Sequence, residues 1–192
     1  MPRATAPKKP PNASIYKPPN NHDWVVSADE LIPGPAHTIA VQRDAQIANF
    51  ADFCNACGNC DTFCPEYGGP FILKPNFFGS LAAWQTAGRE SFFIDAEEAA
   101  PCIHGRIDGA EYRLAVVPGW DGFRFEDGVL CLSVRAADHT VASWFAFGPH
   151  DASGHVVNLH AYHTLRILLA SLLRADRVHP VNSPRRPQGR AY

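Results

Sequence analysis

Four of the six cysteines in this 192-residue chain lie close together at Cys54, Cys57, Cys60 and Cys64, and a proline follows the last of them. The resulting spacing, C-x2-C-x2-C-x3-C-P, is typical of bacterial ferredoxins, whose thiolates ligate iron–sulfur clusters. Two-residue gaps let a loop wind around one face of a cubane. Small residues between the cysteines suit this winding, because parts of it need positive φ angles. The spacing therefore predicts a [4Fe-4S] cluster bound by these four cysteines.

Zinc and a structural or disulfide role are the alternatives for the same thiols. Zinc sites usually pair two C-x2-C knuckles a dozen or more residues apart, because a tetrahedral ion is approached from two directions. The sequence offers no second knuckle of this kind. A disulfide is disfavoured if the protein is cytoplasmic, where thiols are kept reduced.

The identity of the fourth ligand is open, because in two-cluster ferredoxins the last cysteine of the run ligates the other cluster. Cys64 could complete a single cluster, a remote cysteine could replace it, or Cys64 could reach a cluster held mainly by a partner. Cys131 stands between Leu130 and Leu132 in a predicted strand and is expected to be a small buried hydrophobic residue. Cys102 is therefore the alternative fourth ligand, and the four clustered thiols are the predicted set.

The stretch NFADFCNACGNCDTFCPEYGGPFILKPNFF, residues 49–78, resembles the C-terminal iron–sulfur segment of the YgfK-type putative selenate reductase subunits. That family is similar to the small subunit of glutamate synthase and to dihydropyrimidine dehydrogenase. The family segment reads DFCNxCGNCxTFCPxxGxPYxxKPxxF, and Phe71 departs from it where the family has Tyr. The match covers about thirty residues and extends beyond the cysteines. The resemblance implies electron relay next to a large flavin-dependent oxidoreductase.

Composition narrows the function further. The net charge of -2 and pI near 6.5 lack the basic footprint of a nucleic-acid-binding protein. No apolar run follows the basic N-terminus, and no eighteen consecutive residues are apolar, so we expect neither a secretory signal nor a membrane span. The expected location is cytoplasmic.

No G-x-G-x-x-G fingerprint, P-loop or nucleophile–histidine grouping is evident. The chain is therefore expected to be a non-catalytic electron-transfer subunit whose larger partner subunit carries flavin or another redox centre. The alternative function is a non-redox assembly or scaffold subunit with a zinc or structural cluster site. A cluster that acts as a sensor is a third interpretation.

The predicted fold class is α+β. Residues 1–37 and 177–192 are Pro-rich arms, the second of them basic, and residues 38–176 are an iron–sulfur and antiparallel sheet domain. Alternating apolar residues between Arg106 and Phe147, with an Asp127-Gly128 hairpin signal, predict three or four antiparallel strands. Apolar residues every three or four positions over 156–173 predict a helix that covers the sheet. A short helix is expected between an N-cap at Ser80 and a stop at Gly88.

Two further groups of residues are expected to be structural. His155, His160 and His163 lie on or near the predicted C-terminal helix without a matching carboxylate, so they are expected to be satisfied histidines and not metal ligands. Trp120, Trp144, Phe145 and Phe147 are expected to be sheet-core or interface aromatics.

Overall fold

The computed structural model describes residues 21–39, 48–62, 69–95, 100–148 and 152–173. An eight-stranded sheet has the order β10-β9-β8-β7-β6-β5-β4-β3, and a second sheet has the order β11-β1-β2. The large sheet comprises β3 (Asn49–Phe50), β4 (Asn76–Phe78), β5 (Ser91–Asp95), β6 (Cys102–Ile107), β7 (Ala110–Val116), β8 (Gly122–Glu126), β9 (Leu130–Arg135) and β10 (Val141–Ala146). The predicted α+β class, with a C-terminal helix after the strands, is confirmed.

The antiparallel part of the large sheet runs from β5 to β10. The strands predicted between Arg106 and Phe147 correspond to β7–β10, and β5 and β6 precede them. The predicted Asp127-Gly128 turn joins β8 to β9. There the Asp127 carboxylate accepts hydrogen bonds from the Val129 and Leu130 amides, and Gly128 has φ 85°. A left-handed glycine at this point lets a tight hairpin follow the twist of its strands.

The sheet is larger than predicted and is not purely antiparallel. Strands β3, β4 and β5 are parallel and extend it beyond the hairpins. The sequences of these strands are short apolar runs without alternation. Phe77 of β4 and Phe92 of β5 lie buried in the core. Short apolar runs of this kind do not reveal which strand they will pair with.

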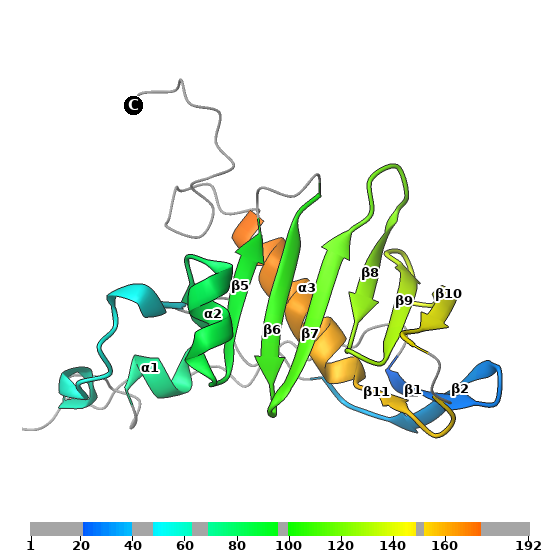
Figure 1. The fold of residues 1–192 in the computed structure, drawn as a ribbon, viewed down its shortest axis with the longest axis horizontal. Coiled ribbons are helices and arrows are strands. Elements are labelled where there is room, and N and C mark those ends of the chain that lie inside the picture. The colour runs from blue at the N-terminus through cyan, green and yellow to red at the C-terminus, as the bar shows by residue number, and fades with distance from the viewer. Residues whose placement is uncertain (1–20, 40–47, 63–68, 96–99, 149–151, 174–192) are drawn as a thin grey trace, which may run out of the picture.

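Helix α3 (Leu159–Leu173) covers one face of the large sheet and crosses behind β5, β6 and β7 (Figure 1). Tyr162, Leu165 and Leu169 lie buried against the sheet core. Gly105 allows the helix to come close, because a Cβ atom there would lie 2.5 Å from Leu165 Cδ2. None of the helices in the described ranges combines the length and apolar content needed to cross a membrane.

The predicted N-terminal arm is wrong for residues 22–36, which fold as a hairpin of β1 (His22–Ser27) and β2 (Glu30–Ala36). Strand β1 also pairs with β11 (Val156–Val157), just before α3. Trp24 and Val26 are buried on one side of β1, so the hairpin has a real hydrophobic face despite its proline content. The other predicted arm positions, 1–20 and 177–192, lie outside the described residues.

A buried polar cluster joins the β9–β10 turn to α3. His139 has φ 56° and is 5 % exposed, and its Nδ1 lies 3.0 Å from the Tyr162 hydroxyl. Its ring packs edge-on against the ring of His163, with centroids 5.0 Å apart. Burial and then the positive charge of Arg166 lower the pKa of His139, against a smaller opposing effect of Asp138.

The close approach of α3 to β6 predicts a strong packing effect. Gly105→Ala inserts a methyl group against Leu165 and Phe92 and should lower the free energy of unfolding by about 1–3 kcal/mol. Denaturant unfolding of this variant, of Leu165→Ala and of the double variant gives the coupling between the two sites. A sub-additive loss is expected, because the shorter side chain makes room for the methyl group. Additive losses would contradict the contact.

The buried His139 predicts a pH-dependent stability. Its folded-state pKa lies below the unfolded value of about 6.5, so the unfolded chain takes up a proton first as the pH falls. The free energy of unfolding should therefore decrease as the pH drops below about 6.5. His139→Asn, which tolerates the left-handed backbone, should flatten this dependence. Equal pH profiles for wild type and His139→Asn would refute the assignment.

Candidate functional site

The cysteine run forms the connection between two parallel neighbours, β3 and β4, at the edge of the large sheet. A 3₁₀ turn, η1 (Ala51–Phe53), leads directly to Cys54, and a second, η2 (Asn59–Thr62), contains Cys60. The connection ends with α1 (Pro70–Leu73) before β4 begins. We call residues 54–64 the cysteine loop. Its last cysteine, Cys64, lies outside the described residues.

The backbone between the cysteines turns sharply. Ala56 has φ 53° and Gly58 has φ 77°, as expected for a loop that winds around a compact group. For Ala56 the left-handed conformation costs about 1–2 kcal/mol. The Asn55 side chain supports the turn by accepting a hydrogen bond from the Cys57 amide at 3.2 Å. The sequence-based prediction of positive φ angles in this loop is confirmed at Ala56 and Gly58.

Hydrogen bonds outside the cysteine loop tie its entry to the strand that follows it. Asp52 Oδ2 accepts a hydrogen bond from the Gly79 amide at 2.8 Å, and the Asn49 side-chain amide donates to Asn76 Oδ1 at 2.7 Å. Asn76 in turn donates to the carbonyls of Phe71 and Lys74, both at 3.1 Å. Sequence reasoning did not assign these polar residues a role, although Asp52 and Lys74 belong to the stretch that carries the family resemblance.

Gly79 is required for the Asp52 anchor. A Cβ atom at this position would lie 2.6 Å from Asp52 Oδ2 and 3.1 Å from the Phe50 ring. Any larger residue at position 79 would therefore displace the Asp52 carboxylate, which accepts the hydrogen bond from the backbone amide of that same position. Gly79 and Asp52 act as a matched pair at the base of the loop.

A shallow hollow beside Cys54 is formed by Phe78, Ala83, Thr86 and Arg89. Half of the residues that line this hollow belong to α2 (Leu81–Ala87), the helix predicted after Ser80. The Ser80 hydroxyl accepts a hydrogen bond from the Ala83 amide and caps this helix. Gly88 ends the helix with φ 60°, as predicted. The position of α2 therefore decides what surrounds the first cysteine.

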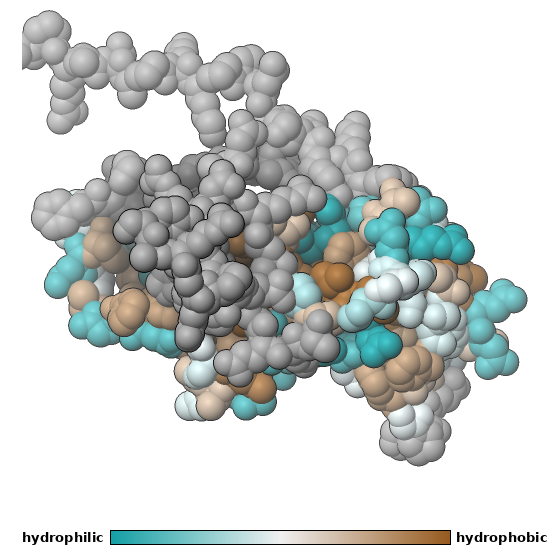
Figure 2. All heavy atoms as spheres, turned by 90° about the horizontal axis from the view of Figure 1, so that it is seen from above, coloured by the Kyte–Doolittle hydropathy of each residue, from teal (hydrophilic) through white to brown (hydrophobic). Residues whose placement is uncertain are grey.

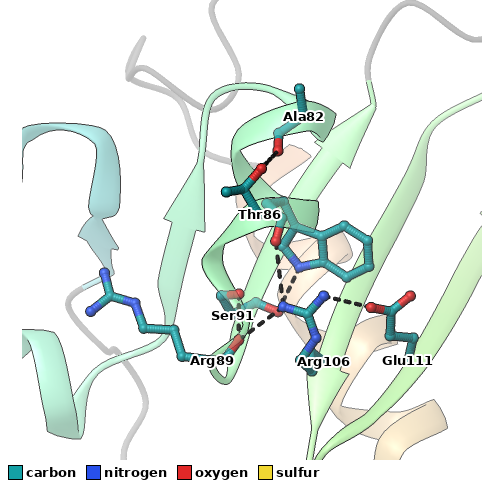
Figure 3. Close-up of polar contacts among 7 residues, drawn as sticks. Ala82, Thr86, Arg89, Ser91, Arg106 and Glu111 are labelled. Atoms are coloured by element: carbon teal, nitrogen blue, oxygen red, sulfur yellow. Dashed lines mark hydrogen bonds and ion pairs between the residues drawn. The ribbon is translucent and has the colours of Figure 1, made fainter.

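Helix α2 is held in place by Arg106 of β6, as Figure 3 shows. The Arg106 guanidinium donates to the carbonyls of Trp84 and Arg89, forms an ion pair with Glu111, and lies 4.9 Å from the centre of the Trp84 ring. Trp84 also donates its indole N–H to the Ser91 carbonyl at 3.2 Å. The Arg89 side chain points away from this network, towards the edge of the sheet that carries the cysteine loop (Figure 3).

The side chains at the base of the cysteine loop include unusually exposed apolar groups. Phe53, just before Cys54, is 84 % exposed. Ile72, in α1 after the cysteine loop, is 64 % exposed. The Phe53 ring still contacts Phe50, with centroids 5.1 Å apart. Large exposed apolar groups next to a candidate site are typical of surfaces that contact other molecules.

The two other cysteines lie elsewhere in the sheet. Cys102 is fully buried in β6, with its sulfur 3.6 Å from His104 Nε2. Three strand spacings, about 14 Å, separate β6 from β3, where the cysteine loop begins. Cys131 is buried in β9, as predicted, and burial raises the pKa of its thiol. The structure therefore places neither of these cysteines beside the loop entry.

The three histidines on or near α3 lie in separate environments. His155 bonds to Asp127 at 2.7 Å, His160 is exposed on α3, and His163 is buried next to Tyr162. Among the residues that the structure describes, no three His, Cys, Asp or Glu side chains are gathered as a metal-binding group. Cys64 is not among those residues. The donor set itself, soft thiolates in a tightly wound loop, fits an iron–sulfur cluster or zinc.

No family model, curated protein or solved structure matches the chain.

The Asp52 anchor predicts a local effect on the loop. Asp52→Ala removes the acceptor of the Gly79 amide, so hydrogen exchange at Gly79 should accelerate by about fivefold, the equivalent of roughly 1 kcal/mol. Asp52→Asn keeps an oxygen of the same shape and should retain most of the protection. Unchanged exchange at Gly79 in the alanine variant would show that the carboxylate does not hold the loop.

Proposed function

We propose that this chain is an iron–sulfur electron-transfer subunit of a multi-subunit oxidoreductase, in which Cys54, Cys57, Cys60 and Cys64 bind one [4Fe-4S] cluster. The observation that carries the proposal is the spacing of these four cysteines with the proline that follows. This spacing is typical of the cysteine runs that ligate iron–sulfur clusters in bacterial ferredoxins. Such a cluster supplies reversible one-electron oxidation and reduction.

The geometry around the loop supports this proposal. Left-handed backbone at Ala56 and Gly58 turns the chain sharply between the cysteines, as winding around one compact group requires. The Asp52–Gly79 hydrogen bond fixes the entry of the loop relative to the exit from β4. Anchors of this kind reduce the entropy that the loop loses when its thiolates converge on one group.

The exposed surface next to the cysteines supports transfer to another protein. Phe53 and Ile72 place apolar surface beside the loop, where a larger subunit with flavin or another redox centre would dock. The sequence has none of the common nucleotide-binding fingerprints, so we assign the substrate chemistry to that partner. We place the assembly in the cytoplasm, where thiolate ligands stay reduced before the cluster is inserted.

Metal analysis tests this function directly. The full chain is purified anaerobically, iron and acid-labile sulfide are measured per chain, and the dithionite-reduced protein is examined by EPR. About four irons and four sulfides with a reducible signal are expected. Zinc without sulfide would overturn the redox function and favour the assembly or scaffold role.

Single substitutions identify the ligand set. Cys54→Ser, Cys57→Ser, Cys60→Ser and Cys64→Ser should each lower the iron content or change the EPR signal, because each removes a thiolate ligand. Cys102→Ala is the matched control and should leave both unchanged. If Cys102→Ala lowers the iron content and Cys64→Ser does not, Cys102 is the fourth ligand in place of Cys64.

A further inference from the structure

Strand β10 (Val141–Ala146) is the outermost strand of the large sheet at the end opposite the cysteine loop (Figure 1). The stretch from Val141 to Phe147, VASWFAF, contains no charge and no proline. Proteins usually protect such edges with charged residues, prolines or bulges, because an open edge pairs with other chains. Here a bulge interrupts the ladder only near Ala142, at the start of the strand. Among the described residues, the rest of β10 is therefore an edge without these protective features.

The hydrogen-bond pattern of β10 shows which backbone groups face outward. The Phe147 amide donates to the Val129 carbonyl of the β8–β9 connection, and Phe145 pairs with Cys131 of β9. Because bonded and non-bonded pairs alternate in an antiparallel ladder, the N–H and C=O groups of Trp144 and Ala146 point away from β9. No described strand pairs with that side of β10.

A groove runs between β10 and the β1–β2 hairpin. One wall contains Trp24 and Leu31, and the other contains Val141 and Trp144. The carboxylate residues Asp29 and Glu30, both exposed, stand at the turn of the hairpin along the same groove. The groove therefore combines apolar walls with negative charge on one side.

Hydrophobic surface lies at this end of the molecule. Phe145 is 55 % exposed and Phe147 is 43 % exposed, and their rings pack edge to face at 5.4 Å. The space-filling view from above shows hydrophobic and hydrophilic surface interspersed at the end that carries β8 to β10 (Figure 2). Exposed aromatic pairs next to an open strand are typical of binding surfaces.

We propose that this groove binds an extended segment of a partner protein, which adds to β10 as a further strand. The outward groups of Trp144 and Ala146 supply its main-chain hydrogen bonds, and the apolar walls take alternate side chains of the segment. Asp29 and Glu30 select a segment with Lys or Arg at the hairpin end. The ligand class is thus a basic extended peptide with apolar residues at alternate positions.

Shape and charge favour a single peptide strand over a second copy of this chain. The hairpin lines the groove beside the start of β10, so an added strand lies alongside its acidic turn. The β10 stretch VASWFAF itself carries no positive charge to complement Asp29 and Glu30. A basic peptide supplies that charge, whereas pairing of two β10 strands does not.

A phage-displayed library of random octapeptides, selected on the full chain, tests the proposal. The expected peptides alternate apolar residues and carry Lys or Arg, and their binding should shift the amide NMR signals of Trp144 and Ala146. Ala146→Pro removes an outward N–H at a position where an edge strand tolerates proline, and should weaken binding at least tenfold. The paired charge reversal Asp29→Lys with Glu30→Lys should weaken binding of the basic peptides by a similar factor and favour acidic ones.

Asp121→Lys is the matched charge control, because Asp121 is exposed but does not line the groove. It should leave binding within about twofold of wild type, a difference of roughly 0.4 kcal/mol. The proposal is overturned if no peptide is enriched, if selected peptides ignore both the charge reversal and Ala146→Pro, or if the shifts map elsewhere. Dimers of the free protein with Trp144 and Ala146 protected would instead assign the edge to a second copy. If Ala146→Pro does not fold, the charge reversal alone decides.

Discussion

The close packing of α3 on β6 is the contact on which the arrangement of the other elements depends. Because Gly105 has no side chain, Leu165 can lie directly on the strand, and the large core forms on that face. Side chains alternate along a strand, so Arg106 must then point to the opposite face. There it meets the end of α2 and holds the wall beside Cys54. The absence of a Cβ atom at Gly105 thus influences the position of α2, the helix next to Cys54.

The cysteine loop relies on the sheet for its base and on its own sequence for its shape. Parallel pairing of β3 with β4 brings its two ends together, and the pairs Asn49–Asn76 and Asp52–Gly79 connect them. The left-handed residues inside the loop need no such support from distant elements. This division explains how a tightly wound ligand loop can sit at an exposed sheet edge without a core of its own.

The two ends of the large sheet are suited to different tasks. At one end, β3 leads into the cysteine loop, and at the other, β10 offers an open strand beside an acidic hairpin (Figure 1). A segment bound at β10 would leave the surface around Phe53 uncovered. A subunit organised in this way can be tethered to one partner while the cysteine loop faces another, which is the arrangement that the proposed electron relay requires.

Local patterns in the sequence determined α2, α3, the hairpin at Asp127-Gly128 and the candidate ligands, because each depends on neighbours a few residues away. Alternation along β7 to β10 and the period of α3 likewise predict the covered sheet. The parallel strands β3 and β4 and the N-terminal hairpin were decided only by tertiary structure, since short apolar runs pair with whichever partner completes the core. The same holds for the Asp52–Gly79 and Arg106–Trp84 contacts. Their partners are separated by twenty or more positions, and nothing in the local sequence links them.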